Sequence, residues 1–106
     1  MSDEPIIPGT IDRPDTKLLP DLKHPRNYTV LVHNDNFTPM EFVVIVLETV
    51  FHKTPSESIQ IMLNAHTHGS SAVGVYTYEI AETKIQKAHD MAEKEEYPFM
   101  CTMEED

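Results

Sequence analysis

Apolar and polar residues follow one another in patterns that predict three short strands and three helices. β-branched and apolar residues run together at positions 28–32, which is typical of a strand. Further along the chain, apolar residues recur at the three- and four-residue spacing of a helix. The predicted strands are residues 28–32, 72–76 and 98–103, and the predicted helices begin at Pro39, Pro55 and Tyr78, the last of them ending at about Lys94.

Capping signals mark the ends of these helices. Thr38 and Thr54 each precede a proline and stand three residues before a glutamate, which predicts a capping box with proline at the first helical position. Thr77 is the expected N-cap of the third helix, and Gly69 the expected left-handed C-cap of the second. The first helix is expected to close at residues 52–53. The residues predicted to face the core are Met40, Val43, Val44, Leu47, Val50 and Phe51, then Ile59, Met62, Leu63 and His66, then Ala81, Ile85, Ala88 and Ala92.

The element order β-α-α-β-α-β predicts a small α+β fold. Three short strands are too few to be covered on both faces, so we expect a largely antiparallel, three-stranded sheet with three helices packed on one face. Residues 27–106 form this expected core domain. Residues 1–26 hold five of the eight prolines and little periodic pattern, which predicts a flexible arm, either a loose end or a tether with a mechanical role.

Charge and cysteine content narrow the function classes. The chain has 106 residues, with 18 acidic and 8 basic side chains and a formal net charge of −10. Such a surface repels phosphate groups, so we expect neither nucleic-acid nor membrane binding. Cys101 is the single cysteine, which excludes an internal disulfide. The chain shows no membrane-spanning run and no secretory signal, so a cytoplasmic protein is expected.

A polar turn after the first strand is the strongest candidate site. Asn34, Asp35 and Asn36 stand just before a predicted helix, where such residues often only stabilise a turn through their own backbone. They could also supply oxygen acceptors to a cation such as a primary ammonium group, which has three donors and no acceptor. The spaced ligands of a calcium loop are missing.

Other candidate residues support weaker hypotheses. His66 and His68, with Asp35, could form a small metal site, although residues two apart on a helix point in different directions. Ser70 and Cys101 are possible nucleophiles without the motif that would activate either. Methionines such as Met40 and Met62 fill gaps in cores or line adaptable apolar binding surfaces.

The stretch from Tyr28 to Met103 resembles the ClpS family, the bacterial adaptors of the N-degron (N-end rule) pathway. The combination Asn-Asp-x-x-Thr-Pro-Met-Glu-Phe-Val, which begins at Asn34, is highly specific to that family. The segments that carry the resemblance are residues 32–43, 60–63, His66, 74–77, Glu79, 81–84 and 98–104.

The resemblance implies a non-catalytic adaptor without a cofactor. Members bind proteins whose first residue is Leu, Phe, Tyr or Trp and deliver them to the AAA+ unfoldase ClpA, which works with the peptidase ClpP. A monomer is expected, and the arm is expected to be engaged by the unfoldase. By the family pattern, Asn34, Asp35 and His66 hold the α-amino group, Glu79 and Lys84 dock on the unfoldase, and the side-chain pocket is shaped by Asn36, Thr38, Met40, Val43, Met62, Ala65 and Phe99.

Three positions depart from the family pattern. Asn36 stands where an aspartate is frequent, Ala65 where a larger β-branched residue is common, and Phe99 where leucine is usual. One change enlarges the expected cavity and another fills it, so the preference among the four first residues stays open. The alternative function is a small His/Asp metal-binding protein.

Overall fold

The computed structural model describes residues 26–106, which form six elements in the predicted order. Apart from Arg26, the predicted arm lies outside the described residues. No helix of the described part is long and apolar enough to cross a bilayer. The elements are β2 (Asn27–His33), α2 (Met40–Thr49), α3 (Pro55–His68), β3 (Ser70–Thr77), α4 (Tyr78–Lys94) and β4 (Met100–Glu105).

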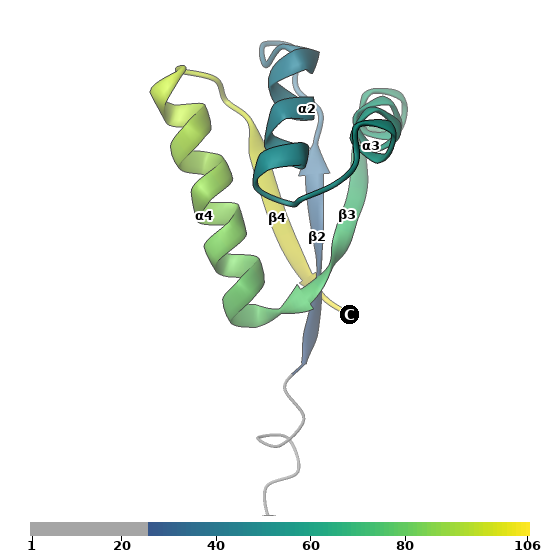
Figure 1. The fold of residues 1–106 in the computed structure, drawn as a ribbon, viewed down its shortest axis with the longest axis vertical. Coiled ribbons are helices and arrows are strands. Elements are labelled where there is room, and N and C mark those ends of the chain that lie inside the picture. Colours follow the sequence, from purple (N-terminus) through teal and green to yellow (C-terminus); the bar gives the residue numbers. More distant parts are fainter. Residues whose placement is uncertain (1–25) are drawn as a thin grey trace, which may run out of the picture.

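A three-stranded antiparallel sheet supports the three helices. β2 lies in the centre and pairs with β3 on one side and β4 on the other. Val32 stands opposite Ser71 in β3 and opposite Cys101 in β4. The helices cover one face of this sheet, with α2 between α3 and α4 (Figure 1). The predicted fold class is therefore confirmed. Each strand differs from its predicted bounds by one or two residues, and β4 begins and ends later than expected.

The core lies between the sheet and the helices. Val30 and Val32 are both buried, because alternate residues of β2 point toward the same face. The predicted alanine stripe of α4 is also confirmed, since these small side chains are buried and let the helix approach the sheet closely. The largest fully buried side chains are Leu47, Val30, Val32, Val46 and Ser58.

The start of α2 differs from the prediction. The helix begins at Met40, and its N-cap is Pro39 without a side-chain capping bond. Thr38 does not cap the helix, because its hydroxyl group donates a hydrogen bond to Asp35 instead. The helix ends at Thr49, earlier than expected. The predicted stripe also omitted Phe42 and Val46, which are buried, and included Met40, which is exposed.

The ends of α3 agree with the sequence, but its buried face does not. Thr54 and Glu57 form the predicted capping box, and Gly69 ends the helix with φ of 94°. However, Ile59 and Leu63 are 47 % and 45 % exposed, whereas the small residues Ser58 and Ala65 are buried. The apolar periodicity of α3 therefore does not mark its core face, because a helix at the side of the sheet packs most closely through small side chains.

Replacing Ser58 by alanine is expected to stabilise the protein. The Ser58 hydroxyl is fully buried and finds no hydrogen-bond partner among residues 26–106, and such an unsatisfied group costs about 1–3 kcal/mol. Alanine is also the better helix former. Urea denaturation of Ser58→Ala should give a higher midpoint with an unchanged slope. Ser56→Ala, on the exposed first turn of α3, is the matched control and should change stability little. A lower midpoint for Ser58→Ala would show that the Ser58 hydroxyl group does make a stabilising hydrogen bond.

Candidate functional site

The turn between β2 and α2 is shaped by a carboxylate. Asp35 Oδ1 accepts hydrogen bonds from the backbone N–H groups of Phe37 and Thr38, at 2.8 and 2.7 Å. Its Oδ2 accepts a third from the Thr38 hydroxyl at 2.8 Å. Partial burial raises the pKa of Asp35, but these hydrogen bonds outweigh it, so the pKa lies below its ordinary value. The Asp35 side chain is therefore negatively charged at neutral pH.

A backbone hydrogen bond ties this turn to the end of α3. The N–H of Asn34 donates to the carbonyl oxygen of Gly69 at 2.9 Å. Gly69 can occupy that position because it adopts the left-handed conformation that ends α3. His66 lies one turn earlier on the same helix. The bond therefore holds two residues far apart in sequence, Asn34 and His66, beside the same space.

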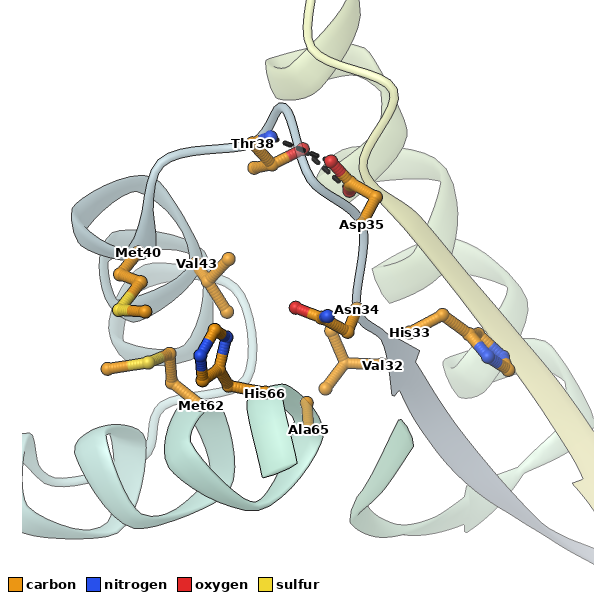
Figure 2. Close-up of a pocket in the computed structure, with 10 residues that line it drawn as sticks. All are labelled: Val32, His33, Asn34, Asp35, Thr38, Met40, Val43, Met62, Ala65 and His66. Carbon is orange, nitrogen blue, oxygen red and sulfur yellow. Dashed lines mark hydrogen bonds between the residues drawn. The ribbon is translucent and has the colours of Figure 1, made fainter. Parts of the chain in front are cut away.

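A hollow of about 310 Å³, counted with the part open to solvent, lies between this turn, α2 and α3. Figure 2 shows the Asn34 side chain and the His66 ring extending into it, while the Asp35 carboxylate turns toward Thr38 at its edge. Met40 and Met62 lie together at one side. The residues that line the hollow are Val32, His33, Asn34, Asp35, Thr38, Met40, Val43, Met62, Ala65 and His66.

These residues combine apolar walls with polar acceptors. Val43 and Ala65 present only hydrocarbon to the space, and the methionine thioethers can adapt to different apolar shapes. An amide oxygen at Asn34 and an unprotonated imidazole nitrogen at His66 can each accept a hydrogen bond. The Asp35 charge lies close by. The arrangement can hold a ligand that carries a small cationic group next to an apolar side chain. The acceptors would bind the cation, and the apolar walls would contact the side chain.

Eight of the ten residues predicted to bind an amine or shape a pocket are brought together here. Asn36 and Phe99 are not among the lining residues. Asn36 is an exposed member of the turn. Phe99 is 5 % exposed and lies in the core, where its ring meets Phe42 edge-on with 5.8 Å between the centroids.

Two lining residues were not predicted. Val32 could have been found from its alternation with Val30, which places both on the helix-covered face of β2. His33 ends the same strand, and its Nε2 atom lies 2.7 Å from the Thr102 hydroxyl oxygen. Its ring points toward β4 and away from the hollow (Figure 2). His33 therefore borders the hollow with the part of the residue nearest the backbone and not with its ring. Sequence alone does not indicate this position.

The predicted docking residues Glu79 and Lys84 share a second hollow, beside the start of α4. Glu79 is exposed in the first turn of the helix. Lys84 Nζ donates a hydrogen bond to the Val50 carbonyl oxygen at 2.9 Å and lies 5.6 Å from the centre of the Tyr76 ring. Lys84, which is partly buried as a residue, therefore joins α4 to the end of α2.

The weaker hypotheses find little support in this geometry. Within residues 26–106, no three histidine, cysteine, aspartate or glutamate side chains come together to hold a metal ion. His68 Nδ1 instead lies 3.2 Å from the Asn64 carbonyl oxygen. Burial raises the pKa of Cys101 to about 12, so its thiol remains protonated and a poor nucleophile at neutral pH. Ser70 lies at the start of β3, outside the residues that line the hollow.

Comparison with known proteins shows the family of this chain. Residues 23–102 match the sequence model of ClpS, described as ATP-dependent Clp protease adaptor protein ClpS. The chain is 48 % identical over 91 residues to the ATP-dependent Clp protease adapter protein ClpS of Phenylobacterium zucineum (strain HLK1), a match covering 86 % of this chain and 84 % of the relative. It is 51 % identical over 81 residues to the protein of the same name from Syntrophus aciditrophicus (strain SB), covering 76 % of each.

The fold is also similar to a solved structure. That structure is Agrobacterium tumefaciens ClpS2 bound to L-phenylalaninamide. The TM-score is 0.76 and the sequence identity 38 %, and the match covers 78 % of this chain and 100 % of the other.

Proposed function

The chain belongs to the ClpS family of Clp protease adaptors, and we propose that it binds N-degron substrates by their first residue and delivers them to the ClpA/ClpP AAA+ protease, modulating its substrate choice. The substrates are proteins with a free α-amino group and a Leu, Phe, Tyr or Trp side chain at the N-terminus. The observation that carries the proposal is the hollow in which Asn34 and His66 lie beside apolar walls.

The α-amino group is held by the polar edge of the hollow. A protonated amine has three N–H donors, which need acceptors from Asn34 and from the unprotonated nitrogen of His66. Asp35 adds a negative charge and fixes the turn that carries Asn34. Hydrogen bonds to a charged group contribute about 1.5–3 kcal/mol each before ordering costs.

The first side chain enters the apolar part. Its walls come from Met40 and Val43 of α2 and from Met62 and Ala65 of α3. Burying a large apolar side chain there is worth roughly 1.5–3 kcal/mol. The ligand of the related ClpS2 supports this placement, since L-phenylalaninamide carries both a free α-amine and a benzyl group. Its carboxamide group corresponds to the first peptide bond of a protein, so the compound resembles an N-terminal phenylalanine.

Delivery requires a second surface and no catalysis by the adaptor. Glu79 and Lys84 are the proposed docking residues for the unfoldase, and their hollow is lined by other residues than the substrate site. Residues 1–26 are the proposed segment that the unfoldase engages. We infer a cytoplasmic monomer that acts by binding alone.

Binding of a Phe-initiated peptide, measured by fluorescence anisotropy, tests this function. Asp35→Ala should raise the Kd at least tenfold, at about 1.4 kcal/mol per factor of ten, because it removes both a charge and the acceptor that shapes the turn. Asp35→Asn is the matched control, since its amide oxygen can still accept the backbone bonds without the charge. An unchanged Kd for Asp35→Ala would refute the role of this residue. If the unaltered protein bound no such peptide, the proposed function would fail as a whole.

A further inference from the structure

A groove runs along the side of α4 that faces the end of α2, from the proposed docking residues toward the end of the helix. The hollow beside Glu79 and Lys84 and a neighbouring hollow nearer the end of the helix share Val50 and Lys87 among their lining residues. The two hollows therefore adjoin each other along the helix. We call this feature the α4 groove, which lies between the end of α2 and the α4 residues Ile80, Lys84, Lys87, Met91 and Lys94.

The groove follows one face of the helix. Residues 80, 84, 87, 91 and 94 are three or four positions apart, so they lie above one another along α4. The buried alanines Ala81, Ala88 and Ala92 lie on the neighbouring face, about 100° around the helix. At 1.5 Å per residue, the face from Ile80 to Lys94 is about 20 Å long. That length suits an extended or helical protein segment better than a small molecule.

Positive charge is concentrated in this groove. The chain has 8 basic residues against 18 acidic ones, and three of the lysines lie here. Lys87 and Lys94 are exposed, while Lys84 is held by the Val50 carbonyl group. The acidic residues on the groove are Glu79, at its beginning, and Asp90, which accepts a hydrogen bond from Gln86 at 3.0 Å.

Apolar surface accompanies the lysines. Ile80, in the first turn of α4, is 49 % exposed although its side chain is large and apolar. Met91 is partly buried and Val50 is buried, so both present apolar atoms at the floor of the groove. Apolar centres with charged rims are the usual composition of a protein–protein interface. Cationic rims favour acidic partners and speed their association.

We propose that the α4 groove binds an acidic segment of the AAA+ unfoldase that carries at least one apolar side chain, so that docking extends past Lys84 to Lys87 and Lys94. This proposal rests on the proposed function, in which Glu79 and Lys84 face the unfoldase. Two observations favour this occupant. The groove includes those two residues, and it is basic on a chain whose net charge of −10 repels acidic segments elsewhere.

Charge reversal at two lysines tests the proposal. Binding of full-length Lys87→Glu and Lys53→Glu variants to the N-terminal domain of an AAA+ Clp unfoldase is measured by calorimetry at two salt concentrations. Both variants change the net charge equally, but Lys53 lies outside the groove, in a hollow with Glu57 at the start of α3. Lys87→Glu should weaken binding about tenfold and reduce its salt dependence, while Lys53→Glu should change it less than twofold. Both should bind a Phe-initiated peptide normally.

The other outcomes are distinguishable. Equal effects of the two substitutions would overturn the proposal but leave the adaptor function intact. Loss of unfoldase binding by the unaltered protein, with peptide binding retained, would remove the docking role and this proposal together. If deleting residues 1–25 tightened unfoldase binding in the unaltered protein but not in Lys87→Glu, the groove would hold the chain's own arm. If the unaltered protein formed a concentration-dependent dimer that Lys87→Glu abolished, the groove would bind a second copy of the chain.

Discussion

Acetylation of the α-amino group should weaken binding of a Phe-initiated peptide by at least about a hundredfold. Acetylation removes the positive charge and two of the N–H groups that would donate hydrogen bonds to Asn34 and His66. Two lost hydrogen bonds to a charged group, at about 1.5–3 kcal/mol each, account for this factor, and the acceptors left unpaired add to it. Anisotropy titrations with the free and acetylated forms of one labelled peptide measure the difference directly.

A pair of small competitors separates the amine from the side chain. L-phenylalaninamide should displace the labelled peptide, whereas its N-acetyl derivative should fail at the same concentration, although both carry the same benzyl group. A peptide with a free N-terminal serine controls for the opposite case, an intact amine without a large apolar side chain. Equal displacement by the two phenylalanine compounds would show that the polar edge of the hollow does not recognise the amine.

Local signals in the sequence were sufficient for most of the fold. Alternation in β2, the Thr54–Glu57 capping box and the alanines of α4 each depend on neighbours within four residues, so they could be predicted. The start of α2 could not be predicted in the same way. The Thr38 hydroxyl group had two possible hydrogen-bond partners, the helix N-terminus and Asp35. Spacing alone does not say which of them it binds.

The candidate site depends on contacts that spacing does not contain. Asn34 and Asp35 are adjacent in sequence and were identified as possible acceptors. Their meeting with His66 requires the hydrogen bond from Asn34 to Gly69, which joins β2 to the end of α3. From the residues alone, a structural role for His66 was favoured over a binding role, and the family resemblance supplied the pairing. The buried face of α3 was missed because its small residues carry no hydrophobic signal.

Replacing Phe99 by alanine should destabilise the folded domain by about 3–5 kcal/mol, a large part of the 5–15 kcal/mol typical of such a domain. Phe99 is almost fully buried, and its ring packs edge-on against Phe42, which meets Tyr97 in the same way at 4.9 Å. Alanine would leave a cavity and remove this aromatic contact. Urea denaturation measures the loss. Asn36→Ala, at an exposed position of the turn, is the control and should change stability by less than about 0.5 kcal/mol.

The milder substitution Phe99→Leu decides whether this residue also shapes the substrate pocket. Leucine keeps most of the buried volume, so the domain should remain folded while the ring is lost. Because Phe99 packs against Phe42 in the core and is not among the residues that line the hollow, the ratio of Kd values for Phe- and Leu-initiated peptides should stay within about twofold of the unaltered protein. A larger shift in that ratio at unchanged stability would mean that Phe99 shapes the side-chain pocket, as the family pattern implies. Packing in the core and substrate preference would then be coupled through α2.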